Sequence, residues 1–381
     1  MNYEGILTGS KQLGPFPMER LKRVEQPTNL ITSNWQRVDE NGFGKAMRGE
    51  FGALAKVGAQ GYRFSSRHPL SAALVDMVAQ LIPGVAREVA PSKAPVPEDP
   101  VLLSRHIKRL GYFLGADIVG ICRLPQSAVY HHALSGNPVE LNHQFAIVVV
   151  LRQEYETMRA CQGYGLIVGA QSFRTYSRLA LITEVIENYI KRLGYPARAH
   201  HPRHYQVVMP PLLLYAGIGE ISRIGIVVNP FLGPRLKAAA VTTDFPLMPD
   251  KPVDFGLQDF CNHCQKCARE CPTHAIPAGN KSMYNGYETW RINVEACVRF
   301  WVTNQDSTGC CNCIKVCPWN KPQAWYHRAV EWSLERSKLA RRLIVRLDDI
   351  MGYGKQVKEE KWWFDLKEVD GLLKLQGGRH R

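Results

Sequence analysis

Residues 261–272 read CNHCQKCARECP, and residues 310–320 read CCNCIKVCPWN. In the first stretch, three cysteines are each separated by two residues, and a fourth follows after three more, directly before a proline. This spacing is typical of bacterial ferredoxins, in which three cysteines bind one [4Fe–4S] cluster and the fourth binds a neighbouring cluster. The second stretch repeats the end of the pattern, so the sequence predicts a small module that two clusters hold together.

The cysteines divide into two complete ligand sets if the last cysteine of each motif crosses to the other cluster. Cys311 is then left over, and it would replace Cys310 if the loop folded differently. Zinc sites also use pairs of cysteines separated by two residues, but two crossing motifs favour iron–sulfur over zinc. The predicted ligands are Cys261, Cys264, Cys267 and Cys317 for one cluster, and Cys271, Cys297, Cys310 and Cys313 for the other.

The composition is that of a globular protein with a metal-binding segment. The chain has 381 residues, of which 45% are apolar and 22% charged, which allows a large core with an inserted module. Nine of the eleven cysteines fall between 261 and 317, a clustering that indicates metal binding in a reducing compartment. The other two, Cys122 and Cys161, lie beside apolar segments and are predicted to be buried. The longest aliphatic stretches, such as 146–151, are too short to span a bilayer, so no transmembrane segment is expected.

The N-terminal residues lack the apolar region and the cleavage site of a signal peptide, and no twin-arginine pair occurs there. We therefore expect a cytoplasmic protein, or the mature form of an exported protein whose twin-arginine signal was removed. The net charge is +14, but the basic residues occur in short groups without a nucleic-acid-binding motif. This pattern favours a basic surface or a docking face for an acidic electron donor, and no nucleic-acid partner is expected.

Apolar periodicity, β-branched runs and breaker residues predict the regular elements. The predicted helices cover 100–114 and 177–193, and the predicted strands cover 118–122, 145–151, 205–214 and 223–228. Five prolines in 83–100 indicate an extended connection. The alternation of helices and strands predicts an α/β or α+β layer architecture.

Composition also divides the chain into four predicted segments. From Phe255, cysteine, proline and asparagine become dense and apolar periodicity fades, as in a small metal-bound module. After Lys321 several tryptophans follow, and this part is expected to pack back on the core. The segments are 1–100 (extended, packing on the core), 101–254 (an α/β domain with the active site), 255–325 (the cluster module) and 326–381 (the C-terminal segment).

Most of the chain resembles the reductive dehalogenases, the corrinoid and iron–sulfur enzymes that remove halogen from organic halides. The most specific stretches are 216–261 and 309–322, and the likeness also covers 17–28, 114–124, 146–160 and 176–197. The resemblance implies a nitroreductase-like core over 101–254 that binds cobalamin base-off, followed by a ferredoxin-like two-cluster module. The chain contains no Asp-x-His-x2-Gly motif, the usual source of a protein ligand to cobalt, which agrees with that expectation.

By the same resemblance, the reaction replaces carbon–halogen by carbon–hydrogen in an organohalide, and two [4Fe–4S] clusters feed a Co(I) corrinoid. The electrons are expected from an external donor, which is a ferredoxin, a flavodoxin or a membrane-linked carrier. A halogenated aromatic or phenolic substrate is preferred, because a cationic pair could hold a phenolate oxygen. The oligomeric state stays open.

The resemblance assigns the proton donor to Tyr176, with Lys237 as the cation that favours its phenolate form. Arg235 is the alternative cation, and Arg299 is a candidate for a second cation near the substrate. By local sequence alone, a tyrosine at the start of a helix usually serves packing, and a lysine such as Lys237 usually lies on the surface. The competing tyrosines are Tyr155, Tyr164 and Tyr215.

A glycine-rich turn, AGIGEISRIG at 216–225, is predicted to let the backbone approach a large cofactor. An ordinary turn between strands would use the same glycines. The candidate cofactor-binding residues are Gly217, Gly219, Gly225 and Arg235.

Two other functions compete with dehalogenation. The epoxyqueuosine reductases share the corrinoid-plus-clusters plan, and a charge of +14 would suit their tRNA substrate, but they use a carboxylate as proton donor where this chain offers Tyr176. An electron carrier would have the clusters and no corrinoid. A minimal domain that metal clusters hold together needs only about 60 to 80 residues. The long region before Cys261 therefore favours an enzyme.

Overall fold

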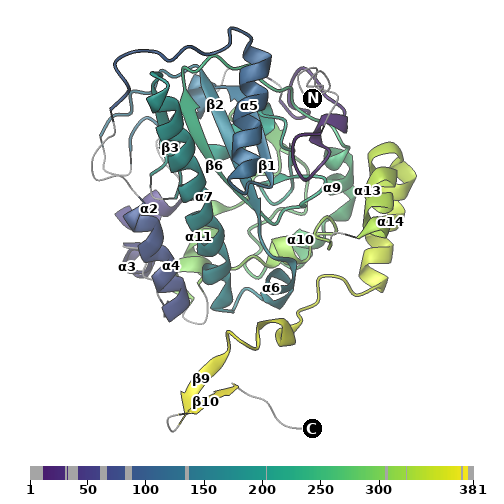
Figure 1. The fold of residues 1–381 in the computed structure, drawn as a ribbon. Helices are drawn as coiled ribbons and strands as arrows, with labels where there is room; N and C mark the ends of the chain where they lie inside the picture. Colours follow the sequence, from purple (N-terminus) through teal and green to yellow (C-terminus); the bar gives the residue numbers. More distant parts are fainter. Residues whose placement is uncertain are drawn as a thin grey trace.

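An antiparallel sheet of four strands lies at the centre of the computed structural model (Figure 1). The strands run in the order β1 (Ile118–Arg123), β2 (Phe145–Arg152), β6 (Leu236–Thr243) and β3 (Ala197–His200). The structure describes residues 12–30, 32, 42–60, 67–81, 88–133, 137–202, 204–304, 308–322, 324–369 and 372–375. Parts of the predicted segments 1–100 and 326–381, including the first eleven residues, lie outside the described residues.

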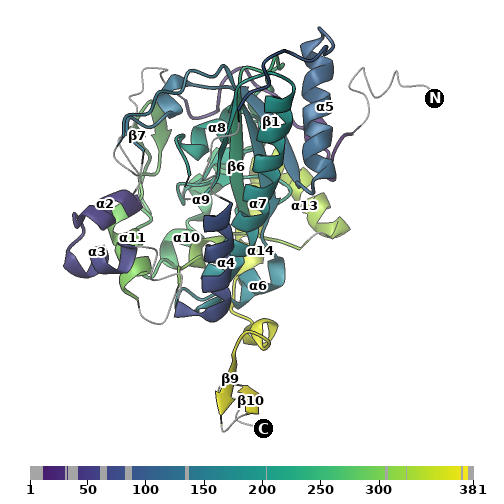
Figure 2. The same ribbon diagram turned by 60° about the vertical axis from the view of Figure 1, so that its left-hand side comes forward.

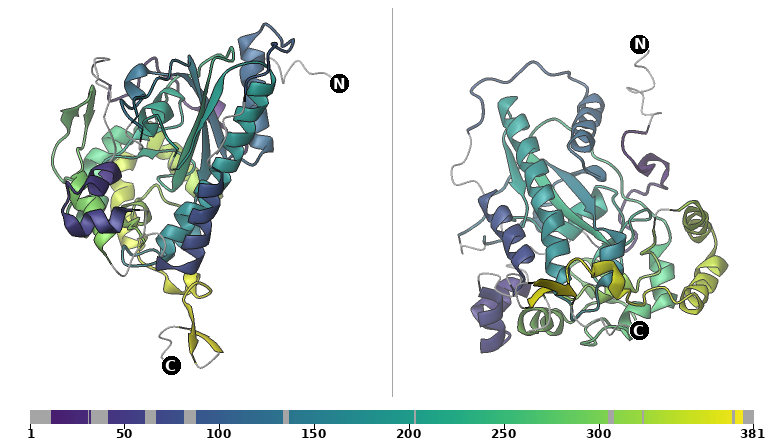
Figure 3. Two further views of the ribbon diagram at one scale, coloured as in Figure 1. Left: turned by 90° about the vertical axis from the view of Figure 1, so that its left-hand side faces the viewer. Right: turned by 60° about the horizontal axis from the view of Figure 1, so that its bottom comes forward.

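Both faces of the sheet are covered. α5 (Pro100–Phe113) and α7 (Ile167–Arg192) lie on one face, and the left panel of Figure 3 shows both helices on the same side of the sheet. α8 (Met209–Tyr215) packs on the other face together with N-terminal residues. Along β2 the side chains alternate, so that Val149 faces α5 and α7 while Val148 faces α8. Because both faces are buried, β2 is an almost continuous apolar run.

Every pairing in this sheet is antiparallel. Parallel strands joined by helices would define an α/β sheet, so of the two predicted architectures the observed one is α+β. The predicted likeness to nitroreductases stays a prediction.

The predicted helix over 100–114 and the strands over 118–122 and 145–151 are confirmed as α5, β1 and β2. The helix predicted over 177–193 is longer, because α7 begins at Ile167. Cys122 and Cys161 are buried, as predicted.

The strand predicted over 205–214 is wrong, because most of this stretch forms α8. Pro210 and Pro211 lie in the first turn of that helix, where a missing N–H costs nothing, whereas proline cannot donate to a sheet ladder. The strand predicted over 223–228 is reduced to β5 (Val227–Val228), which pairs with β4 (Glu220–Ile221). Residues 222–225 instead form a turn, which a hydrogen bond from the N–H of Gly225 to the carbonyl of Ser222 closes.

The cysteine-rich region forms short helices below the sheet, and three N-terminal helices flank it (Figures 1 and 2). Among the described residues, no helix is long and apolar enough to cross a membrane. The remaining elements are η1 (Met18–Arg20), α2 (Gly42–Arg48), α3 (Ala53–Ala59), α4 (Pro69–Gln80), η3 (Gln126–Ala128), α6 (Tyr155–Ala160), α9 (Leu257–Cys264), α10 (Lys266–Arg269), β7 (Ser282–Tyr284), β8 (Tyr287–Thr289), α11 (Val294–Thr303), α12 (Asn312–Lys315), α13 (Trp325–Arg336), α14 (Lys338–Ile350), η4 (Lys358–Lys361), β9 (Leu366–Val369) and β10 (Leu372–Leu375).

The C-terminal segment packs mainly on the cysteine-rich region. α14 packs against α9, and the backbone N–H of Val357 donates to the carbonyl of Arg159 in α6. The tryptophans are not what holds the segment in place, since Trp325 is 81% exposed and Trp362 is 58% exposed. The hairpin β9–β10 projects away from the body of the protein (Figures 1 and 2).

Candidate redox and proton-transfer site

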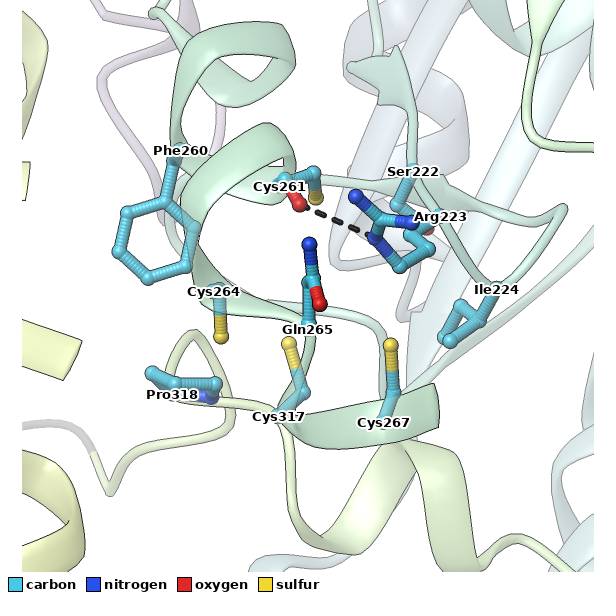
Figure 4. A pocket seen from close by; sticks show the side chains of 10 residues that line it. All are labelled: Ser222, Arg223, Ile224, Phe260, Cys261, Cys264, Gln265, Cys267, Cys317 and Pro318. Carbon is cyan, nitrogen blue, oxygen red and sulfur yellow. Dashed lines mark hydrogen bonds between the residues drawn. The ribbon is translucent and has the colours of Figure 1, made fainter. Parts of the chain in front are cut away.

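Four thiols converge on one hollow at the end of α9, in the arrangement that Figure 4 shows. Cys261 and Cys264 occupy the last turn of α9, and Gln265, in the left-handed region at φ 51°, ends that helix. The chain then turns into α10, which carries Cys267, and Cys317 comes from the segment after α12. The structure therefore brings together the four cysteines predicted for the first cluster, and we call them the first ring.

Arg223 forms part of the wall of this hollow (Figure 4). Its side chain is 1% exposed. The guanidinium donates to the carbonyl oxygens of Cys261 at 3.1 Å, Pro277 at 2.8 Å and Gly279 at 3.0 Å, and it lies 4.5 Å from the centre of a Trp290 ring. A buried cation with this many partners fixes the backbone of a ring cysteine and places positive charge beside the thiols.

Burial raises the pKa of the ring thiols, to about 11 for Cys264 and about 12 for Cys267. Thiols of this kind stay protonated at neutral pH, so binding of an iron–sulfur cluster must release protons. Among the described residues, no three His, Cys, Asp or Glu side chains form a site for a single metal ion.

The four cysteines predicted for the second cluster also lie near one another, and we call them the second ring. Burial raises the pKa of Cys310 to about 12, and the neighbouring thiols Cys311, Cys297 and Cys271 add to this effect. Burial also raises the pKa of Cys313, and here too Cys310 and Cys297 contribute. Gly163 makes room for the ring, since a Cβ there would lie 3.2 Å from the sulfur of Cys310.

The leftover thiol, Cys311, is buried in the core around the second ring. Burial raises its pKa, and the charge of Lys237 opposes that increase. Cys311 is thus close both to the second ring and to Lys237. The assignment of Cys310 as the ligand stays a prediction.

Lys237 and Tyr176 lie side by side, as the resemblance implied. Alternation along β6 puts Lys237 on the same face as Ala239 and Val241, which is the face that α7 covers. Its ammonium nitrogen lies 5.2 Å from the centre of the Tyr176 ring. Burial lowers the pKa of Lys237, but Tyr176 and Cys311 outweigh burial, and the pKa is raised overall. Tyr176 is inside α7 and not at its start, because the helix begins at Ile167.

Arg299 has a different setting from the one predicted. It is exposed on α11, and its guanidinium pairs with Glu295 one turn earlier, at 3.4 Å. Its charge is therefore directed to solvent and does not join the Tyr176–Lys237 pair. A role near the substrate stays a prediction.

Arg235 links the sheet to the cysteine-rich region. It is 2% exposed and donates to the carbonyl oxygens of Gln153 at 2.7 Å and Lys321 at 3.0 Å. Burial lowers its pKa to about 10. These contacts give Arg235 a structural role, because they join the sheet to the segment after the cysteines. Its predicted cofactor-binding role stays a prediction.

Protein atoms fill the space around the predicted cofactor-binding glycines. A Cβ on Gly219 would lie 2.0 Å from the carbonyl oxygen of Val228, and one on Gly217 would lie 2.0 Å from a guanidinium nitrogen of Arg23. Gly225 packs near Ile292. A tight turn between strands is sufficient to explain these glycines, and their cofactor-binding role stays a prediction.

Sequence reasoning missed Arg223 and the pair that Lys266 forms with Asp348. Lys266 lies between two ring cysteines, and its ammonium is 2.7 Å from the carboxylate of Asp348 on α14. The position of Lys266 inside the motif was the only local signal. Arg223 lies in the glycine-rich turn at 216–225, but only its glycines were singled out, and nothing near Asp348 in the sequence marks it as part of the site.

The comparisons with known proteins agree with this geometry. Residues 260–321 match the family described as the 4Fe-4S dicluster domain. The chain is 30% identical over 323 residues to the tetrachloroethene reductive dehalogenase of Sulfurospirillum multivorans, which covers 75% of this chain and 62% of that protein. A tetrachloroethene reductive dehalogenase of Desulfitobacterium hafniense is 30% identical over 276 residues, covering 59% of this chain and 49% of the relative.

A solved structure of the catabolic reductive dehalogenase NpRdhA, in complex with 3-bromo-4-hydroxybenzoic acid, superposes with a TM-score of 0.89. It is 39% identical and covers 98% of this chain and 55% of that one. Over most of its length the chain is therefore similar to reductive dehalogenases. The chain spans only about half to three-fifths of the length of the reductive dehalogenases named here.

An epoxyqueuosine reductase of Synechococcus is a more distant relative of this chain. It is 30% identical, but only over 120 residues, which are 29% of this chain.

Proposed function

We propose that this chain catalyses reductive dehalogenation, replacing a carbon–halogen bond of an organohalide by carbon–hydrogen. The observation that carries the proposal is a continuous series of three groups: the first ring, the second ring and the Tyr176–Lys237 pair. Burial is the main cause of the raised pKa of Cys313 in the second ring, and the thiol of Cys267 in the first ring raises this pKa further. Cys313 and Cys311 in turn act on Lys237. The proposed path of the electrons therefore ends close to Tyr176, the proposed proton donor.

The cysteines of the first ring fit one of the groups that such a reaction needs. The first ring offers four converging thiols, the donor set of a [4Fe–4S] cluster. Tyr176 and Lys237 are only partly buried, so they can contact a bound group. A solved relative, 40% identical with a TM-score of 0.89, is described as suggesting a mechanism for B12-dependent dehalogenation. A corrinoid bound base-off would supply the reducing cobalt centre at this place.

The chain's own contribution is a proton and a positive charge. The phenol of Tyr176 holds the proton that the product carbon receives. The ammonium of Lys237 stabilises the phenolate that remains, since an adjacent cation favours the charged form. The raised pKa of Lys237 keeps this cation in place at neutral pH, although burial alone would lower it.

We further propose a halogenated phenol as substrate. NpRdhA was solved with 3-bromo-4-hydroxybenzoic acid. In this chain the ammonium of Lys237 could also pair with a phenolate oxygen, which is a strong charge-assisted contact.

Anaerobic reconstitution with iron, sulfide and cobalamin tests the proposal. We expect eight iron and one cobalt per chain, as two four-iron clusters and one corrinoid require, and halide release from a brominated phenol. The change Tyr176→Phe should leave both metal contents intact and abolish halide release. Full iron loading without cobalt would instead identify an electron carrier, and full activity of the Phe variant would exclude Tyr176 as the proton donor.

A further inference from the structure

The outer face of α14 exposes an apolar ridge. Its members are Leu339, Leu343, Leu347 and Ile350, which are 67%, 50%, 49% and 81% exposed. With 3.6 residues per turn, these side chains lie within about 80° of one another around the helix axis. Contiguous apolar surface of this kind marks an interaction site, whereas single exposed leucines do not.

A row of cations runs along one flank of this ridge. Lys338, Arg342 and Arg346 are exposed and follow one another at helical spacing. The opposite face of the helix, with Val345 and Asp348, is buried. The exposed face therefore has an apolar centre and a positively charged edge, which is the usual anatomy of a protein interface.

The same helix packs against α9, which carries Cys261 and Cys264 of the first ring. Val345 on its inner face belongs to the same core cluster as Cys261 and Cys264. Asp348 pairs with Lys266, which lies between Cys264 and Cys267 in the chain. A molecule docked on the ridge would therefore be separated from α9 by one helix, which is about 10–12 Å across with side chains.

The second ring is the one near the Tyr176–Lys237 pair, since Cys311 and Cys313 act on Lys237. Thr308, two residues before Cys310, also accepts a hydrogen bond from Gly169 of α7. In the proposed function, electrons would therefore enter at the first ring. A partner that delivers them must come close to the first ring, and α14 packs on α9, which carries two of its cysteines. The outer face of α14 combines an apolar ridge with exposed positive charge. Electron-transfer partners bury small interfaces, for which one helical ridge is sufficient.

We propose that the outer face of α14 is the docking site for an acidic one-electron carrier protein that reduces the cluster at the first ring. This proposal depends on the proposed function in one respect: a cluster must be bound at the first ring. In each encounter the carrier loses one electron, the cluster gains it, and no bond is formed or broken. An acidic partner matches Lys338, Arg342 and Arg346 in charge and is steered toward them. A second copy of this chain, with a net charge of +14, would be repelled.

The test follows the rate of cluster reduction in the reconstituted full chain. Reduced flavodoxin serves as the acidic carrier, and dithionite serves as a reductant that needs no docking site. The variant Arg342→Glu with Arg346→Glu is compared with the matched control Arg109→Glu with Arg192→Glu, which changes two exposed arginines on α5 and α7. Both pairs change the net charge by the same amount.

Flavodoxin should reduce the α14 variant at least about tenfold more slowly than the wild type and with a weaker dependence on salt. The rate with dithionite should be unchanged, and the control variant should remain close to the wild type. A second variant, Leu343→Ser with Ile350→Ser, should raise the flavodoxin concentration needed for half-maximal rate while leaving the salt dependence intact.

Three results would overturn the proposal: an equal effect in the control variant, no effect in either α14 variant, or a wild-type dimer that the α14 variants dissociate. Binding to anionic vesicles that the α14 variant loses, with an unchanged flavodoxin rate, would assign the face to a lipid surface instead. The assay reads cluster reduction and not halide release. A protein that shows the expected flavodoxin rates but releases no halide would therefore contradict the proposed function and support the docking site.

Discussion

Asp348 connects the C-terminal helix α14 to the first ring, and its replacement by Asn should destabilise the protein by about 3 kcal/mol. The carboxylate is 3% exposed and pairs with Lys266, at 2.7 Å, and with Lys321. These lysines are themselves only 7% and 13% exposed. Removing the negative charge leaves two buried ammonium groups, of which Lys266 retains Asp349 while Lys321 loses its carboxylate partner.

The size of the effect follows from burial. Breaking a buried ion pair by removing one partner costs about 3 to 5 kcal/mol, because the charge left behind stays desolvated. Asn keeps the volume of the side chain and one hydrogen-bond acceptor, which places the expected loss at the lower end of that range. Because Lys266 lies between Cys264 and Cys267, we also expect a lower iron content.

Asp349 is the matched control, since it is the next residue on the same helix and also pairs with Lys266, at 3.0 Å. Its side chain is 39% exposed, so Asp349→Asn should cost less than about 1 kcal/mol. The free energy of unfolding is measured by urea titration with tryptophan fluorescence. A loss at Asp348 no larger than the loss at Asp349 would refute the argument that burial sets the strength of this contact.

Three further predictions concern the proton donor, the backbone and the acid range. Lys237→Met should lower halide release by at least about a hundredfold at unchanged iron content, with partial recovery in Lys237→Arg; an unchanged rate would remove Lys237 from the mechanism. A Cβ on Gly233 would lie 2.1 Å from a backbone carbonyl, whereas one on Gly52 meets nothing within 4 Å. Both have positive φ, so Gly233→Ala should lower the melting temperature well beyond Gly52→Ala, and equal shifts would contradict this. Burial holds the pKa of His200 well below its ordinary value and that of His204 at about 4. Below about pH 6.5 the unfolded chain therefore binds more protons, and the free energy of unfolding should fall by up to about 1.4 kcal/mol per pH unit for each histidine; a flat profile between pH 7 and 5 would contradict this.

The comparison of sequence and structure separates local from non-local information. The strands β1 and β2 were predicted because their apolar and β-branched residues are contiguous. The central strand β6 was missed, because its sequence LKAAAVTT has three alanines and little strand preference of its own. Its pairing with β2 and β3 makes it a strand. In 205–214, two adjacent prolines should have outweighed the apolar run, since proline starts helices but interrupts ladders.

The sequence by itself predicted both ligand sets, because the spacing of cysteines within a few residues controls which thiols can reach one cluster. It also indicated Tyr176 and Lys237, through the likeness to a family. Only the tertiary structure decided that these two meet, since β6 must pair in one register for Lys237 to face α7. It also decided the places of Arg223 and α14 beside the first ring. These contacts join residues tens of positions apart, and side-chain packing between distant segments leaves no trace in local spacing.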